Sequence, residues 1–337
     1  MRALRHWTIT AAAAMALLAP SVGVAPARAA TTYTVVDLGT LGGRQSMAEA
    51  VNASGVVVGQ AQTPDGAWHG FIWDAGRGMR SLGTGVHPTG IDDDGRVVGY
   101  LDDATAFSAR GDPPVIEVLP MLSGGQANAT AVDATGGVTG GSFAAGDGWR
   151  AVRWSGAGGP TLLDGPGVSS DGMAINVRGD VAGQYVSDSD GGGRRSMLWT
   201  AGTSVDLGML PGASGMLAEG MNDAGEVVGW ATGGPYSRGF LYRAASGTLV
   251  DLGSLPGRKG AGLRPQDVNN HGVIVGFATN GVAFVKTATG PITDLATLVG
   301  KHPGVRPKRA LAVNDAGQIV GFGGALVADH AFLLTPR

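Results

Sequence analysis

The chain has 337 residues, of which 60 are glycine, 15% are charged and none is cysteine, and its formal net charge is −3. A hydrophobic content of 43% is enough to bury a core, which excludes a disordered chain, and the glycines do not recur every third residue, which excludes collagen. The lack of cysteine excludes a disulfide framework, a thiolate metal site and a cysteine nucleophile, and the charge gives no basic field of the kind that marks nucleic-acid binding.

The first 29 residues have the pattern of a secretory signal peptide. Arg2 and Arg5 precede an apolar stretch over residues 9–18, and small residues lead to Ala27-Arg28-Ala29. The apolar stretch is short for a membrane span, although an N-terminal anchor is the alternative. We therefore expect residues 1–29 to be removed and residues 30–337 to form a secreted, extracellular domain without a membrane attachment.

The rest of the chain repeats one unit seven times. The string Asn/Asp-x-x-Gly-x-x-x-Gly begins at Asn52, Asp92, Asp133, Asn176, Asn222, Asn269 and Asn314. An apolar residue precedes each start, and β-branched residues follow most of them, as in a hairpin whose second strand leaves the turn. Asn and Asp suit such a turn because their side chains accept bonds from nearby backbone N–H groups, and the first Gly supplies a positive φ.

Two further strands complete each unit. An aromatic and aliphatic run lies at 69–73, 150–154, 195–199, 238–242 and 330–334, and an Asp-Leu-Gly type strand follows, clearest at 206–208, 251–253 and 294–296. Four short antiparallel strands in 40 to 47 residues are typical of a β-propeller blade. The last unit stops after its third strand, and residues 33–39 are an unpartnered copy of the fourth.

The sequence thus predicts an all-β fold, a single seven-bladed propeller whose last blade is closed by the N-terminal strand, because closure removes free sheet edges. An open β-solenoid is the alternative. A basic residue recurs at one position of the third strand, and we expect it to pack or hydrogen-bond between blades instead of forming a unique site: His69, Arg150, Arg195, Arg238 and His330.

The unit resembles the bacterial extracellular HAF repeat family. The resemblance rests on residues 37–43, 51–59 and 69–73 and on His330-Ala331-Phe332, and it covers nearly all of residues 33–335. The second unit departs from the pattern, with Thr105-Ala106-Phe107 in the third strand. The resemblance implies export and a propeller-like repeat, and it implies no particular reaction.

Familiar catalytic and phosphate-binding motifs are absent, and we expect no metal or cofactor. Asp92-Asp93-Asp94 suggests calcium but occupies the turn of its hairpin, where a solvated turn is the better interpretation. Residues 188–191 are a slightly better calcium candidate but lack the downstream bidentate acid of a calcium loop.

Residues that break the repeat are the better candidates for binding. The position five before the Asn/Asp is varied, and if it faces the channel, five polar side chains converge on one mouth: His87, Asn128, Asp171, Arg264 and Arg309. The loops before the last two units add a basic group to the same mouth: Arg258, Lys259, Arg306 and Lys308. Aromatic residues after the second Gly would either stack on a ligand there or pack under the loops: Tyr100, Trp230, Phe277 and Phe322.

Our first hypothesis is a secreted, monomeric propeller that binds an extracellular ligand, anionic or glycan-like, at this mouth. A glycan, a polyanion or a small molecule would suit it, and we expect no nucleic acid. The alternative is an enzyme (a lyase, cyclase or hydrolase) with His87 and Asp171 as acid and base and Arg264 and Arg309 as an anion clamp. A third possibility is a structural scaffold. An enzyme would need a deep, water-excluding pocket, whereas a binding module can be shallow.

Overall fold

The computed structural model describes residues 31–156, 158–163, 165–188, 191–258, 260–300, 304–325 and 328–337. The predicted signal peptide lies outside the described residues. Thr31–Arg337 form one compact unit. In the described part of the chain, no helix has the length and apolar character needed to cross a membrane.

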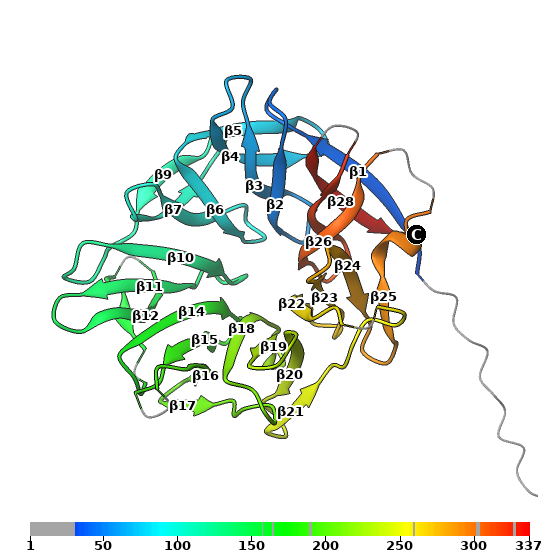
Figure 1. Cartoon of the computed structure of the whole chain (residues 1–337). Helices are drawn as coiled ribbons and strands as arrows, with labels where there is room; N and C mark the ends of the chain where they lie inside the picture. The colour runs from blue at the N-terminus through cyan, green and yellow to red at the C-terminus, as the bar shows by residue number, and fades with distance from the viewer. Residues whose placement is uncertain are drawn as a thin grey trace, which may run out of the picture. The chain divides into compact units, whose positions relative to one another are not determined.

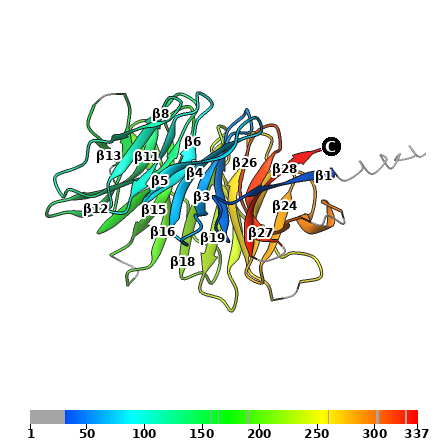
Figure 2. The same ribbon diagram turned by 90° about the horizontal axis from the view of Figure 1, so that it is seen from above.

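Seven four-stranded antiparallel sheets surround a central opening, which confirms the predicted seven-bladed propeller (Figures 1 and 2). The second unit forms a complete blade in spite of its departure from the repeat. From the inner to the outer strand, the blades are β2 (Ser46–Val51), β3 (Val57–Gln62), β4 (Trp68–Asp74), β5 (Gly78–Thr84); β6 (Val86–Ile91), β7 (Val97–Leu101), β8 (Ala106–Arg110), β9 (Val115–Val118); β10 (Ala127–Val132), β11 (Val138–Ala144), β12 (Gly148–Trp154), β13 (Thr161–Leu162); β14 (Ser169–Ile175), β15 (Val181–Val186), β16 (Arg194–Thr200), β17 (Thr203–Asp206); β18 (Gly215–Met221), β19 (Glu226–Thr232), β20 (Arg238–Arg243), β21 (Thr248–Asp251); β22 (Leu263–Val268), β23 (Ile274–Ala278), β24 (Val282–Lys286), β25 (Ile292–Asp294); and β26 (Arg306–Val313), β27 (Ile319–Gly324), β28 (Asp329–Pro336), β1 (Tyr33–Gly39). A short 3₁₀ helix, η1 (Leu295–Thr297), follows β25.

The N-terminal strand closes the ring, as the sequence predicts. Strand β1 pairs with β28 in antiparallel register from Tyr33 opposite Pro336 to Gly39 opposite Ala331 (Figure 1). The backbone N–H of Arg337 donates to the carbonyl of Thr32 at 2.9 Å. The two ends of the described domain therefore lie side by side.

The hydrophobic core lies between the blades. An aromatic residue on the third strand is fully buried in most blades and packs toward the neighbouring sheet: Phe71, Phe107, Trp154, Phe240, Phe284 and Phe332. One cluster joins Val275 and Ala283 of the sixth blade to Ile319 and Phe332 of the seventh. The apolar faces of neighbouring sheets therefore cover each other around the ring.

Each inner hairpin is shaped by the Asn or Asp of the repeated string and by the two glycines that follow it. In the first hairpin the Oδ1 of Asn52 accepts the N–H of Val56 at 2.9 Å, and Gly55 adopts a φ of +77°. A Cβ on Gly59 would lie 2.1 Å from the carbonyl oxygen of Met47, so the second Gly allows the two strands to approach. Every inner strand carries a β-bulge two to four residues before its Asn or Asp.

The same turns also bond each blade to the next, which the sequence analysis did not foresee. At four junctions the Asn side chain donates its Nδ2 to the carbonyl of the equivalent residue in the following blade: Asn52 to Asp92, Asn222 to Asn269, Asn269 to Asn314 and Asn314 to Asn52. At the other three junctions an arginine bonds a carbonyl of the following turn: Arg96 to Gly136, Arg153 to Gly179 and Arg178 to Asp223. All seven junctions are thus bonded at one end of the channel.

The recurring basic residue of the third strand corrects one expectation. Instead of bonding only between blades, it mostly bonds the outer strand of its own blade, because that strand carries the Asp of the Asp-Leu-Gly motif. Arg195 lies 2.8 Å from Asp206, Arg238 lies 3.4 Å from Asp251, and His330 lies 3.0 Å from Asp37. His69 contacts Ser81 of its own blade, and Arg150 bonds the carbonyl of Gly167.

The Asp-Leu-Gly motif ends a strand in the middle blades instead of forming one. Strands β17 and β21 finish at Asp206 and Asp251, and each Asp side chain accepts the N–H of the Gly two residues later, at 2.7 and 2.8 Å. The motif is a turn that directs the chain from the rim toward the next inner strand.

Two neighbouring valines of β1, one buried and one exposed, allow a test of whether this strand closes the ring. Val35 is 5% exposed and belongs to the core, whereas Val36 is 36% exposed. We predict that Val35→Ala lowers the free energy of unfolding by about 1–3 kcal/mol, since it removes buried methyl groups and leaves a cavity. Val36→Ala should change it by less than about 0.5 kcal/mol. Equal effects in denaturant unfolding would contradict the closure.

Candidate functional site

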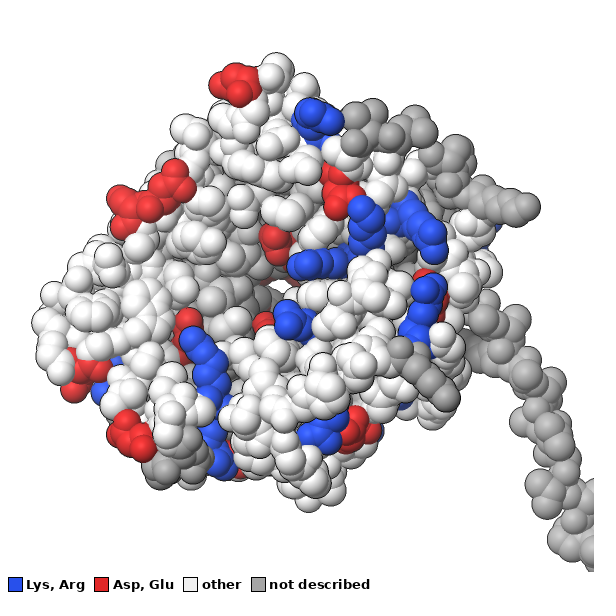
Figure 3. All heavy atoms as spheres, viewed as in Figure 1, with Lys and Arg blue, Asp and Glu red and all other residues white. Residues whose placement is uncertain are grey.

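The channel has two mouths that differ in what forms them. The inner strands begin at one, here called the loop mouth, and end at the Asn/Asp turns of the other, here called the turn mouth. Figure 3 views the loop mouth, where Lys and Arg side chains gather beside the central opening, over the last two blades and the first.

The predicted polar residues share one register position at the loop mouth. Each is opposite the residue that follows the second Gly of its own blade: His87 opposite Tyr100, Asn128 opposite Gly141, Asp171 opposite Gln184, Arg264 opposite Phe277 and Arg309 opposite Phe322. The structure thus brings all five to the same level of the channel. Asn128 interacts with Asp171, whereas His87, Arg264 and Arg309 each contact an aromatic ring in their own part of the ring of blades.

His87 is fixed on three sides. Its ring stacks on Tyr100 with centroids 4.8 Å apart, its Nε2 lies 2.6 Å from Oδ1 of Asp102, and its Nδ1 lies 3.2 Å from Oε1 of Gln60. The Asp102 side chain is 73% exposed, so the imidazole and carboxylate form a polar pair at the rim of the mouth.

Asp171 is the most perturbed group at this mouth. Burial raises the pKa of its carboxyl to about 6, against the opposing effects of Trp149, Arg194 and Asn128 nearby. Its Oδ1 is buried with no hydrogen-bond partner within the described residues. The adjacent Gly141 matters here, because a Cβ at that position would lie 2.6 Å from this oxygen.

Two arginines lie over the faces of aromatic rings. The guanidinium carbon of Arg264 is 4.1 Å from the centre of the Trp230 ring, and that of Arg309 is 4.5 Å from Phe277 and 5.5 Å from Phe322. One face of each of these aromatic rings is therefore covered by an arginine of the protein itself. Stacking of this kind holds the guanidinium plane while leaving its N–H edge available for an anion.

Glu219 supports one of these stacks. Its Oε1 accepts the Trp230 indole N–H at 2.8 Å, and its pKa is raised mainly by burial. Neither Arg264 nor Arg309 has a carboxylate within ion-pair distance in the described part of the chain, and Nε of Arg264 is buried without a partner. These are two fixed cations whose charge is not neutralised by direct contact.

The basic loops surround a cavity of about 240 Å³ outside the stacked pair. Arg258, Arg306 and Lys308 line it together with Asp294. Arg258 lies 3.4 Å from Asp294, and Lys308 lies 2.6 Å from Asp329. Lys259 falls outside the described residues.

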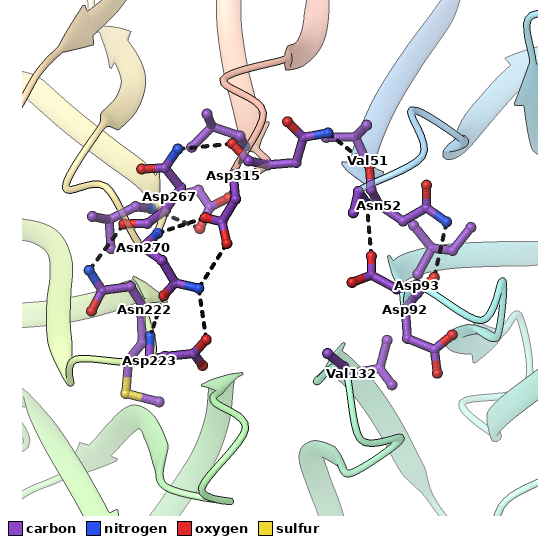
Figure 4. A pocket seen from close by; sticks show the side chains of 18 residues that line it. Val51, Asn52, Asp92, Asp93, Val132, Asn222, Asp223, Asp267, Asn270 and Asp315 are labelled. Carbon is purple, nitrogen blue, oxygen red and sulfur yellow. Dashed lines mark hydrogen bonds between the residues drawn. The ribbon is translucent and has the colours of Figure 1, made fainter.

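The turn mouth holds a second cavity, of about 220 Å³, which the sequence analysis missed (Figure 4). Asp93, Asp223, Asp267 and Asp315 line it with several Asn side chains, and Asn270 donates to both Asp223 and Asp315 at 2.7 and 2.9 Å. Asp267 could have been noticed, because it occupies a position that is Ala or Gly in the other inner strands.

Asp267 ties the last two blades together. Its Oδ2 accepts the N–H of Val313 at 2.9 Å, and its Oδ1 accepts the N–H of Val268 at 2.8 Å. Burial nevertheless raises its pKa to about 6. Within the described residues no group of three or more His, Cys, Asp or Glu side chains is arranged to hold a metal ion.

Comparisons with known proteins identify the fold and no family. No protein-family model matches the sequence, and no curated protein is detectably similar to it. Among solved structures, an oligogalacturonate lyase in complex with manganese is 13% identical, with a TM-score of 0.59 over 92% of this chain and 94% of the lyase.

Two further propellers are similar to the same degree. The propeller domain of the trilobed protease from Pyrococcus furiosus is 8% identical, with a TM-score of 0.57 over 90% of this chain and 93% of that domain. YCF48 bound to a D1 peptide is 11% identical, with a TM-score of 0.54 over 90% of this chain and 96% of YCF48. At such identities the likeness concerns the fold alone.

The two raised pKa values predict how stability depends on pH. Both carboxyls have a pKa of about 6 in the folded protein and an ordinary value of 3.8, so between these values the folded state binds more protons than the unfolded chain. Stability should therefore fall as pH rises from about 4 to 6.5, with at most roughly 3 kcal/mol from each group. Asp171→Asn should remove about half of that decrease.

Urea unfolding at several pH values would measure this effect. Asp103→Asn, at an exposed position, is the matched control and should keep the full decrease. A pH dependence unchanged in Asp171→Asn would show that this carboxyl is as well solvated as in the unfolded chain.

Proposed function

We propose that the protein is an exported, monomeric propeller built from HAF-type repeats, and that it binds an anionic extracellular ligand at the loop mouth. In this proposal residues 1–29 are the signal peptide, and the ligand is glycan-like or another polyanion. The inner contacts are Arg264 and Arg309, and the outer ones are the basic loop residues Arg258, Lys259, Arg306 and Lys308.

The observation that carries the proposal is the state of the two arginines. Many Lys and Arg side chains in the described part of the chain have a carboxylate partner, as Arg195, Arg238 and Arg258 do. Arg264 and Arg309 are held by aromatic stacking instead. An anion that reaches them gains charge-assisted bonds without displacing an internal carboxylate and without ordering a flexible side chain.

A catalytic function at the same mouth is the second candidate. The supporting observation is Asp171, whose pKa of about 6 suits proton transfer near neutral pH. His87, already paired with Asp102, would be the second proton-transfer group. The similar structures include a lyase, a protease domain and a peptide-bound protein, so the fold favours neither binding nor catalysis.

Reversing the two stacked charges tests the binding function. We predict that Arg264→Glu with Arg309→Glu weakens binding of heparin by more than tenfold in calorimetric titration, because it replaces two anion contacts by repulsion. Arg110→Glu with Lys286→Glu changes the net charge equally, and both positions lie at the ends of their strands nearest the turn mouth. This control should retain most of the affinity, and equal losses would point to nonspecific charge attraction.

A further inference from the structure

The rim between the seventh and first blades contains a groove outside the stacked arginines. It has a volume of about 480 Å³ and is lined by Arg44, Gln45, Gln62, Lys308 and Asp329. Arg44 and Gln45 lie in the loop between β1 and β2, so the groove is built where the closing strand passes to the first blade. The groove shares Lys308 with the cavity lined by Arg258 and Arg306.

Strand β26 departs from the other inner strands where it meets this groove. The other six each have one register shift against their neighbour, whereas β26 has a second one, between Pro307 and Arg309. Lys308 is the extra residue in this bulge. A bulge re-aims the inserted side chain, and here Lys308 faces the groove while Arg309 keeps its place over Phe277.

The neighbouring strand leaves room for this lysine. Strand β27 carries Gly323 and Gly324, where the equivalent positions of the first blade carry Ala61 and Gln62. A Cβ on Gly323 would lie 2.0 Å from the carbonyl oxygen of Arg306, and one on Gly324 would lie 3.3 Å from Cε of Lys308. Two side-chain-free positions thus accompany the bulge.

The groove offers cations together with groups that bind hydroxyls. Arg44 is exposed and has no ion-pair partner in the described part of the chain, and Lys308 has Asp329 at 2.6 Å. Gln45 and Gln62 present amides that both donate and accept, and Asp329 accepts only. Acid groups would bind Arg44 and Lys308, and hydroxyls would bind the amides and Asp329. A chain of phosphates without hydroxyls would leave the amide carbonyls of Gln45 and Gln62 without a donor, and Asp329 would repel it.

We propose that this groove is an outer subsite for a linear acidic polysaccharide whose inner acid group binds Arg264 and Arg309. The inference rests on the proposed function and adds the ligand's polymer class and its path. Because Lys308 and Arg309 are consecutive residues, about 3.8 Å apart along the backbone, one chain reaches both the channel mouth and the groove. The ligand therefore runs from the channel outward across the start of β26.

Chain length is the variable that tests the subsite. Calorimetric titration with polygalacturonate oligosaccharides should give an affinity about tenfold higher for an octamer than for a dimer, because only the longer chain occupies both places. Arg44→Glu should reduce octamer affinity about tenfold and leave dimer affinity unchanged. Arg44 is exposed and has no ion-pair partner in the described part of the chain, so the variant should fold.

The controls separate this inference from the proposed function. Arg110→Ala with Lys286→Ala removes two cations elsewhere and should keep the length dependence. If the wild-type protein binds dimer and octamer equally, the outer subsite is wrong while the loop-mouth function stands. If it binds neither oligosaccharide but binds heparin, the polysaccharide subsite is wrong, and if it binds none of the three, the proposed function is wrong as well. Equal or tighter binding of single-stranded DNA of matched charge would overturn the polysaccharide assignment.

Discussion

The hydrogen bond from each turn to the next blade is the constraint on which the rest of the ring depends. At four turns an Asn satisfies its own hairpin with Oδ1 and the following blade with Nδ2, so one side chain fixes both the strand pair and the junction. Asn176 instead donates Nδ2 to Asp180 of its own turn, and Arg178 bonds the following blade. An Asp performs only the first task, since a carboxylate has no donor. Where the second and third blades have Asp92 and Asp133, Arg96 and Arg153 donate the missing bond. An arginine donor thus replaces the Asn donor, and the junction stays bonded although the residue at the turn differs from blade to blade.

The candidate residues at the loop mouth take no part in these junction bonds. The position opposite the residue after the second Gly has no bond to the next turn to maintain, so it carries a histidine, an acid or an arginine in different blades. The register of the inner strands sets the level of this position along the channel, and the aromatic rings set the orientation of the Arg264 and Arg309 side chains. The groove beside Lys308 extends the same arrangement to the rim at the one inner strand that has a second bulge.

The sequence predicted the ring, its closure and the level of the candidate residues, since all three follow from counting positions relative to the Asn/Asp and Gly of each turn. It did not predict which partners those residues have. The stacks of Arg264 and Arg309 join neighbouring blades, and their geometry depends on how two sheets face each other and not on spacing along the chain. Nor did it reveal the junction bonds between blades. The bulge at Lys308 was also missed, because an inserted residue is recognised only from the pairing of its strand with the neighbouring one. Gly323-Gly324 was the one available sign.

The closing pair of strands has a consequence for how the chain reaches its native state. Six of the junction bonds join residues 26 to 47 positions apart. The bond from Asn314 to Asn52 spans 262 positions, and the pairing of β1 with β28 brings together residues such as Asp37 and His330, 293 positions apart. Contacts so distant in sequence are slow to form, and a chain in which β1 and β28 have not yet paired presents two complementary edges. A second molecule offers the same edges. Whether the ring closes on itself or exchanges β1 with a neighbour is then a competition between tethered and free strands, and dilution favours the closed single chain.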